Sequence, residues 1–203
     1  IEGINEKMVE DSPILWDPLT FLESCPSSDG SCSLVISAED SVDANQTPAW
    51  IIATSVRSEP TMYAGRDAVN PVAGTMCAKD VYKQAGIFDP RKEIDCAEIY
   101  VPFSWYEPMW LENLLLADIG DGWKMTENGD TSLEGRFPVN MSGGVLSSNP
   151  IGASGLIRFG EAAQQVRKKA GEYQVPDASI ALGHAFGGGA QFFAMWLVSS
   201  NKP

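Results

Sequence analysis

One stretch of the sequence, from Gly143 to Gly155, constrains this chain more than any other. It begins with paired glycines, passes through an Asn-Pro step at Asn149 and ends in Gly-Ala-Ser-Gly before a pattern with helical spacing. Glycines allow positive φ and let a backbone approach a ligand closely, where a side chain would clash. The positive end of the following helix dipole faces such a loop. A tight packing bend is the plain alternative, but the length of the stretch favours ligand contact.

A second glycine-rich stretch, residues 183–189, carries the only histidine, His184. We expect a turn here, which joins a short strand at 179–182 to a final strand at 192–198. A lone histidine is usually structural or on the surface, but its place in a glycine-rich turn favours a role in a site. Two glycine-rich loops that flank one helix are expected to form two walls of that site.

The composition is that of an ordinary folded protein. Of 203 residues, 44% are hydrophobic and 20% are charged, which is enough for a sizeable core. The formal net charge of −13 argues against nucleic acid or an anionic membrane surface as a partner. No apolar run reaches the roughly 18 residues that a membrane span needs. The first residues also lack the basic-then-apolar order of a signal peptide. We therefore expect a cytoplasmic protein.

The cysteines predict free thiols and no metal site. Cys25, Cys32, Cys77 and Cys96 form no CxxC pair, and one histidine adds little from which a zinc site could be built. A disulfide framework would be unusual at this size and spacing. Cys25 lies beside Pro26 and invites interpretation as a nucleophile, but inert packing is the favoured interpretation.

The order of apolar patterns predicts an α/β fold. Strands are expected at 31–37, 49–56, 94–100, 179–182 and 192–198, and the first two are expected to be buried. Helices are expected at 72–85, 103–117 and 156–170, with short helical candidates at 4–9 and 18–22. An irregular insert over 57–71 and a loop or lid over 123–136 complete the chain. These elements predict a mixed five-stranded sheet with helices packed on its faces, ending in an antiparallel pair.

Four segments, in this order, resemble the C-terminal half of the thiolase superfamily, in particular its sterol-carrier-protein and lipid-transfer-protein branch and related aldolases. They are Cys25–Gly30, Asp95–Phe103, Asn140–Gly155 and His184–Gly189. The third is similar to the thiolase loop Asn-x-x-Gly-Gly…Gly-His-Pro-x-Gly-x-(Ser/Thr)-Gly, and the fourth falls at the closing Cys-x-Gly loop. Each alone is weak, but four with matching separations are specific. The resemblance implies one thiolase-like C-terminal domain over 1–203, with the N-terminal thiolase half outside this chain.

The departures from the thiolase pattern bear on the chemistry. The histidine that thiolases place before the loop proline is Asn149 here, which takes no proton. The Asn or His of the second segment is Tyr100, as in thiolase-like aldolases that cleave side-chain acyl-CoA adducts. Those aldolases also place a tyrosine where Asn149 stands, so the match to them is partial. The cysteine of Cys-x-Gly is replaced, because the run 185–187 occupies its place, with His184 just upstream.

The resemblance implies a site for an acyl-CoA thioester, with coenzyme A as part of the substrate and no separate cofactor. Such a site needs a nucleophile, a base and oxyanion holes. His184 is the leading acid or base because its ordinary pKa lies near neutral. Tyr100 would be an acid or enolate donor, although taken alone it is more often a rim aromatic. Asn149 would donate to a thioester oxygen, although by default it is a turn residue. The expected substrate contacts are Gly143, Gly144, Ser147, Ser148, Gly152, Ser154, Gly187 and Gly188.

Three functions stay open at this point. The leading one is thiolytic cleavage, or the matching acyl transfer, of a 3-ketoacyl-CoA from a fatty-acid or steroid side chain. The first alternative is a retro-aldolase that acts on a 3-hydroxyacyl-CoA, with Tyr100 as the acid–base residue and a small partner subunit. The second is a non-catalytic lobe that binds acyl-CoA or lipid. The resemblance also implies a homo-oligomer, and inactivity of this chain without the half that bears the nucleophile.

Overall fold

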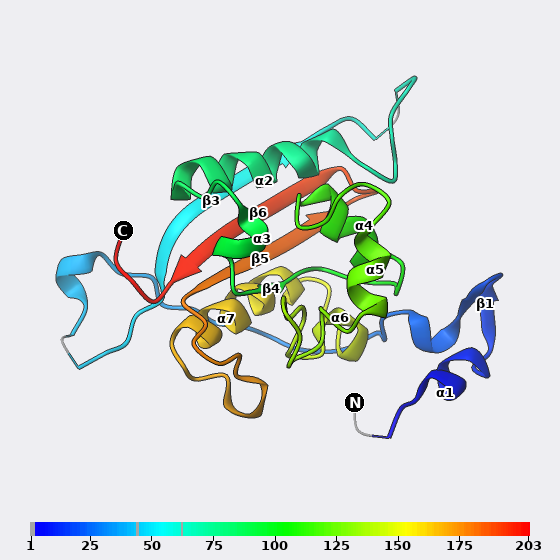
Figure 1. The fold of residues 1–203 in the computed structure, drawn as a ribbon, viewed down its shortest axis with the longest axis horizontal. Coiled ribbons are helices and arrows are strands. Elements are labelled where there is room, and N and C mark those ends of the chain that lie inside the picture. Colours follow the sequence, from blue (N-terminus) through cyan, green and yellow to red (C-terminus); the bar gives the residue numbers. More distant parts are fainter. Residues whose placement is uncertain (1–2, 44, 62) are drawn as a thin grey trace.

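A four-stranded mixed sheet lies at the centre of the molecule, in the order β3-β6-β5-β4 (Figure 1). The computed structural model describes residues 3–43, 45–61 and 63–203. The strands of this sheet are Trp50–Ser58 (β3), Cys96–Glu98 (β4), Ile180–Gly187 (β5) and Phe192–Ser199 (β6). β6 pairs antiparallel with both β3 and β5, and β4 pairs parallel with β5. The predicted α/β class, the mixed sheet and the final antiparallel pair are confirmed.

Helices cover both faces of the sheet. In Figure 1, α2 (Val72–Ala85) lies above the sheet and α7 (Ser154–Val166) lies below it. Successive side chains of a strand point to opposite faces, and the core is divided accordingly. Leu182 of β5 belongs to the cluster under α2, whereas Ala181 belongs to the cluster under α7. The polar side chains described below are assigned to one face or the other in the same way.

Helix α2 forms where the sequence predicts it. Its apolar residues recur at helical spacing, so that Ala73, Cys77 and Val81 are buried against the sheet. The helix ends at Gly86, which adopts a left-handed conformation with φ of 70° and caps the last turn. Glycine adopts this left-handed conformation at lower cost than a residue with a side chain.

The remaining elements surround this core. They are α1 (Glu6–Glu10), β1 (Ile14–Trp16), β2 (Leu19–Thr20), α3 (Pro90–Glu93), α4 (Tyr106–Asn113), α5 (Gly122–Glu127) and α6 (Gly144–Ser147), with 3₁₀ turns at Phe21–Glu23, Glu39–Ser41 and Gly171–Tyr173. β1 and β2 form a separate two-stranded hairpin near the N-terminus, which extends away from the sheet in Figure 1. The short helices predicted at 4–9 and 18–22 are thus α1 and, in place of the second, β2 with a 3₁₀ turn.

The strand predicted at 31–37 is wrong, which leaves four strands in the sheet of the described residues instead of five. The segment is extended but pairs with no strand there. Cys32 and Leu34 contact α7 at Gly160, whereas Val35 is 98% exposed. The strand over 49–56 does form, as β3, but it is an edge strand in which only Ala53 is buried. The apolar content of a strand therefore indicates burial only where other elements cover both of its faces.

Other boundaries differ for local reasons. The helix expected at 103–117 is α4, which ends early because Leu115 adopts a positive φ of 63°. The helix expected at 156–170 is α7, which begins at Ser154 and ends before Lys168, whose φ is 59°. The loop expected over 123–136 includes most of α5. None of the helices in the described ranges is both long and apolar enough to cross a membrane.

Gly183 offers a test of this packing. It pairs with Trp196 across β5 and β6, and a Cβ there would overlap the indole nitrogen. We expect Gly183→Ala to lower the free energy of unfolding by about 1–3 kcal/mol in urea denaturation. The matched control is Gly189→Ala, because a Cβ at Gly189 meets nothing within 4 Å. That variant is expected to change stability by about 0.5 kcal/mol or less, and equal losses in the two variants would contradict the packing described here.

Candidate functional site

Two of the predicted catalytic residues meet directly. The hydroxyl of Tyr100 donates to Oδ1 of Asn149 at 3.0 Å, and the hydroxyl of Ser154 donates to the same oxygen at 2.6 Å. Nδ2 of Asn149 donates to Sγ of Cys25 at 3.1 Å. We call these four side chains the polar cluster. Asn149 and Ser154 are buried, whereas Tyr100 and Cys25 are partly exposed. The cluster can therefore present polar atoms to a ligand from one side.

Tyr100 is positioned by the parallel pairing of β4 with β5. It follows β4 by two residues, and its backbone is bonded on both sides. Nε1 of Trp110, on α4, donates to the carbonyl of Tyr100 at 2.8 Å, and the N–H of Tyr100 donates to Nδ1 of His184 at 3.5 Å. Its ring lies edge-on to Phe186, with centroids 5.3 Å apart. These contacts direct the hydroxyl towards Asn149.

Asn149 is fixed by a neighbouring segment and by the start of α7. Its N–H donates to Oγ of Ser28 at 3.2 Å, and it forms a parallel bridge with Ser27. The carbonyl of Pro150 accepts the N–H of Ser154 at 3.0 Å, which begins the helix. The segment Cys25–Gly30 thus forms one side of the site.

The surroundings of Tyr100 set its protonation. Burial raises the pKa of the Tyr100 phenol above its ordinary value, while the hydrogen bond to Asn149 acts in the opposite direction. The phenol is therefore the resting form at neutral pH and serves as a donor. The cluster combines one titratable oxygen, one thiol and two neutral hydrogen-bonding groups.

His184 lies elsewhere. The turn predicted over 183–189 is wrong at its start, because β5 continues to Gly187 and contains His184. The imidazole is fully buried on the side of the sheet that α4 covers, among Trp110, Phe186 and Phe193. Burial lowers its pKa to about 3, so the ring is neutral at neutral pH. Its Nε2 has no hydrogen-bond partner among the described residues.

The described residues therefore bring His184 to the backbone of Tyr100 and not to the polar cluster. Nδ1 of His184 accepts from the Tyr100 N–H, whereas Asn149 and Ser154 lie at the start of α7, on the other face of the sheet. An acid or base needs access to the proton that it moves. A catalytic role for His184 stays a prediction, and the burial of its ring does not favour it.

The glycine loop at 143–155 has the geometry that its sequence requires. Gly143 and Gly144 adopt positive φ values of 89° and 59°; Gly143 is the N-cap of α6, and Gly144 is the first residue of its single turn. Of the predicted substrate contacts, Gly143, Ser148, Gly152 and Gly188 are exposed, Ser147 and Gly187 are half-buried, and Gly144 and Ser154 are buried. A cavity of about 400 Å³ lies beside the loop, lined by Gly152, by 28–32 and by neighbouring residues of 150–156.

Sequence reasoning missed the roles of two carboxylates, one in β4 and one just before it. Glu98 is 1% exposed and pairs with Arg158 at 2.7 Å. Asp95 accepts the N–H groups of Ser179 and Ile180 at 2.7 Å and 2.8 Å. An acidic residue inside an apolar strand pattern was the available signal, since charges are rarely buried unless paired.

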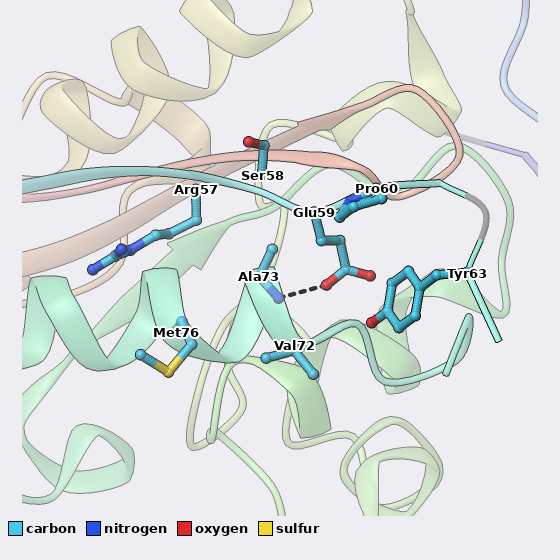
Figure 2. Close-up of a pocket in the computed structure, with 8 residues that line it drawn as sticks. All are labelled: Arg57, Ser58, Glu59, Pro60, Tyr63, Val72, Ala73 and Met76. Atoms are coloured by element: carbon cyan, nitrogen blue, oxygen red, sulfur yellow. Dashed lines mark hydrogen bonds between the residues drawn. The ribbon is translucent and has the colours of Figure 1, made fainter. Parts of the chain in front are cut away.

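A second cavity, of about 430 Å³, lies at the end of β3 and the start of α2 (Figure 2). The carboxylate of Glu59 accepts the N–H of Ala73 there at 2.8 Å and pairs with Arg66 at 2.7 Å. Arg66 also donates to the carbonyls of Gly189 and Ala190, at 2.9 Å and 2.6 Å. None of the predicted site residues lines this cavity. Among the described residues, no group of three or more His, Cys, Asp or Glu is placed to hold a metal ion.

A third and larger cavity, of about 630 Å³, lies between the N-terminal hairpin and the residues that precede α4. Its lining includes Trp16, Leu19, Phe103 and Trp105. It is connected to the polar cluster by backbone bonds, because the N–H of Cys25 donates to the carbonyl of Pro102 at 2.9 Å. The cavity and the polar cluster therefore share the chain segments around Cys25 and Pro102, although neither Tyr100 nor Cys25 lines the cavity.

Comparison with known proteins gives a consistent result. The family described as thiolase C-terminal domain-like matches residues 56–199. Sterol carrier protein 2 of Rattus norvegicus is 31% identical over 200 residues, covering 94% of this chain and 36% of that protein. Acetyl-CoA acetyltransferase of Methanothermobacter thermautotrophicus is 30% identical over 188 residues, covering 91% of this chain and 49% of that protein. The chain thus spans about a third to a half of the length of these curated relatives.

A solved structure supports the fold. The Ltp2-ChsH2(DUF35) aldolase superposes with a TM-score of 0.84 and 23% identity, covering 98% of this chain and 52% of that one. A monomeric SCP2-thiolase-like protein from Mycobacterium smegmatis superposes less closely, with a TM-score of 0.52 and 17% identity over 76% of this chain and 29% of that one. At these identities the likeness concerns the fold alone.

The buried imidazole makes a prediction about pH. The pKa of His184 is about 3 in the folded chain against an ordinary 6.5, so below pH 6.5 the unfolded chain binds a proton that the folded chain does not. This contribution to stability is complete above 6.5 and is lost progressively as pH falls towards 3. Lowering the pH from about 7.5 to 5.5 should therefore cost about 1 kcal/mol.

Urea denaturation of the unmodified chain and of His184→Gln at the two pH values measures this term. The substitution removes the only histidine, so the carboxylates contribute alike to both proteins. The pH-dependent loss should be smaller in His184→Gln by the stated amount. Equal pH dependence in the two proteins would show that His184 titrates in the folded state as it does in water.

Proposed function

Because the chain belongs to the family of thiolase C-terminal domain-like proteins, we propose that it forms part of an enzyme that acts on acyl-CoA thioesters. We propose further that the reaction is a retro-aldol cleavage of a 3-hydroxyacyl-CoA. The observation that carries this choice is the hydrogen bond of 3.0 Å between Tyr100 and Asn149. His184, by contrast, is buried in the core. The titratable groups of the polar cluster are a phenol and a thiol, and no imidazole reaches it.

The proposed reaction uses Tyr100 as the acid–base residue. As its phenolate, Tyr100 takes the proton of the 3-hydroxyl group while the bond between C2 and C3 breaks. The carbonyl product leaves, and the phenol returns a proton to C2 of the thioester enolate, so that no net proton is consumed. Since burial raises the pKa of Tyr100, the phenolate is scarce at neutral pH and the rate is expected to increase as the pH rises.

The neutral members of the cluster would hold the thioester. Asn149 and Ser154 are donors that do not titrate, and they are fixed at the start of α7. Donors fixed in advance around a developing oxyanion stabilise it without reorganising during the reaction. Asn149 in place of a histidine thus keeps a hydrogen-bond donor while it removes a proton acceptor.

The apolar cavity of about 630 Å³ is suited to the acyl group of the substrate. Trp16, Phe103 and Trp105 offer aromatic surface within it, which favours a bulky apolar side chain such as that of a fatty acid or steroid. The name of the structural neighbour describes an aldolase formed with a second protein, which supports a small partner subunit here. The rest of the site would come from an N-terminal thiolase half.

Thiolysis of a 3-ketoacyl-CoA is the second candidate. It is supported by the names of curated relatives, which include an acetyl-CoA acetyltransferase and a benzoylsuccinyl-CoA thiolase subunit of Thauera aromatica, the latter 29% identical over 192 residues. It requires a nucleophilic thiolate, which the thiolase pattern places in the other half of the protein. The two candidates share the fold and the thioester and differ in the acid–base group.

The test is turnover by the full protein with its partner subunit. With 3-hydroxyacyl-CoA, release of an aldehyde or ketone is expected, and Tyr100→Phe should lower kcat by roughly 10²- to 10⁴-fold. The matched control is Tyr106→Phe, which removes the hydroxyl of a neighbouring half-buried tyrosine that stacks on Trp105. Both this control and His184→Gln should retain most of the activity.

The alternatives give different outcomes. Turnover of 3-ketoacyl-CoA with free CoA, and none of the 3-hydroxy compound, would favour thiolysis. Binding of acyl-CoA without turnover of either compound would indicate a non-catalytic lobe. Loss of activity in His184→Gln together with full activity in Tyr100→Phe would show that the acid–base residue is assigned to the wrong side chain.

A further inference from the structure

We infer that Arg158 is a positioning residue for Tyr100: through the buried carboxylate of Glu98 it fixes α7 and the glycine loop against the end of β4. The inference rests on the proposed function in that Tyr100 is taken as the acid–base residue. Arg158 itself does not touch the polar cluster, so its effect is on the placement and charge environment of that cluster.

The carboxylate of Glu98 accepts three hydrogen bonds. Its Oε2 accepts from Nη1 of Arg158 at 2.7 Å and from the hydroxyl of Ser142 at 2.9 Å, and its Oε1 accepts from the Ser142 N–H at 3.2 Å. Nη1 of Arg158 also donates to the Ser142 hydroxyl at 3.1 Å. The two charged side chains are 1% and 4% exposed. Three elements, β4, the segment that leads into Gly143 and α7, are joined at this point.

The side chains of β4 alternate between the two faces of the sheet. Cys96 belongs to the core cluster under α7, while Ala97 and Ile99 belong to the cluster on the other face. Alternation therefore places Glu98 on the α7 side, where it pairs with Arg158. Tyr100 lies two residues beyond β4, where its ring packs against Phe186 and its hydroxyl donates to Asn149.

Helix α7 contributes to both the polar cluster and the ion pair. Ser154 and Arg158 are four residues apart on α7, so they occupy the same face, one turn apart, and both are buried. Ser154 bonds to the Asn149 oxygen that also accepts from Tyr100. The ion pair and the polar cluster are thus successive cross-links between the same strand and the same helix, and a shift of one displaces the other.

Arg158 also affects the ionisation of Tyr100 through its charge. The titratable groups that act on the phenol of Tyr100 are Arg158 from α7 and Cys25 from the segment before Gly30. Glu98 of β4 pairs with Arg158, and the neutral His184 of β5 accepts the N–H of Tyr100. The glycine loop from 140 to 152 contains no titratable side chain. Among these groups Arg158 is the cation, and its charge lowers the pKa of Tyr100 against the larger effect of burial. Arg158 thus favours the phenolate that the proposed reaction needs.

A buried ion pair makes this role testable apart from stability. Removal of one partner leaves an uncompensated buried charge and is strongly destabilising, whereas neutral replacement of both is often tolerated. The variants are therefore Arg158→Lys, which keeps the charge, Arg158→Met, and the double variant Glu98→Gln with Arg158→Met. Arg57→Met is the control, because Arg57 pairs with Asp80 at 2.6 Å on the surface.

The first readout is kinetic, in the full protein with 3-hydroxyacyl-CoA. The double variant should lose about 10- to 100-fold in kcat with little change in KM, because the reacting groups and not the thioester contacts are displaced. Arg158→Lys should recover a large part of that loss, and Arg57→Met should behave as the unmodified protein. An unchanged kcat in the folded double variant would contradict the inference.

The second readout does not depend on turnover. Titration of ¹³Cζ-labelled tyrosine by NMR, with the Tyr100 signal assigned from Tyr100→Phe, reports the ionisation of this phenol directly. Its midpoint should rise in the double variant and stay close to that of the unmodified protein in Arg158→Lys and Arg57→Met. If the folded double variant titrates as the unmodified protein does, the inference is wrong. If the midpoint moves but the unmodified protein cleaves no 3-hydroxyacyl-CoA, the proposed function fails and the effect of Arg158 on Tyr100 stands.

Discussion

The site depends on the parallel pairing of β4, a strand of three residues, with the longer β5. A strand this short contributes few hydrogen bonds of its own, so its position is set by what its side chains meet on each face. Ile99 enters the core on the α2 side, and Glu98 meets α7. Tyr100 follows directly, so its hydroxyl is directed by the same two layers that hold the strand. The contacts that pack the core around β4 therefore also set the geometry of the site.

Different degrees of burial give two polar groups near the ends of β4 and β5 opposite properties. His184 lies between aromatic rings, where burial removes its charge and isolates it from solvent. Tyr100 is only half-buried and has polar neighbours. A residue's ordinary pKa therefore ranks candidates poorly until burial is known. Imidazole was favoured in the sequence because it titrates near neutral pH, yet in this fold the accessible proton donor is the phenol.

The sequence predicts those parts of the fold that local patterns determine. Helix α2 is predicted from its periodicity and from Gly86, and the last two strands from their apolar runs. The run at 31–37 has the same composition as a buried strand, but its pairing depends on a neighbour that a local pattern does not specify. Gly183 was interpreted as a turn residue, whereas it makes room for Trp196. Tyr100 and Asn149 lie 49 residues apart, and only a resemblance placed both in one site. The partners of Glu98 were beyond both kinds of reasoning.

The hairpin that joins β5 to β6 is held from outside its own sequence. Ala190 adopts a positive φ of 54°, a conformation that costs free energy for a residue with a side chain. The guanidinium of Arg66 bonds to the carbonyls on and before this residue, and Glu59 neutralises that guanidinium while it also caps α2. The irregular insert between β3 and α2 thus stabilises the hairpin. The shape of the hairpin depends on Arg66, which lies more than a hundred residues before it in the sequence.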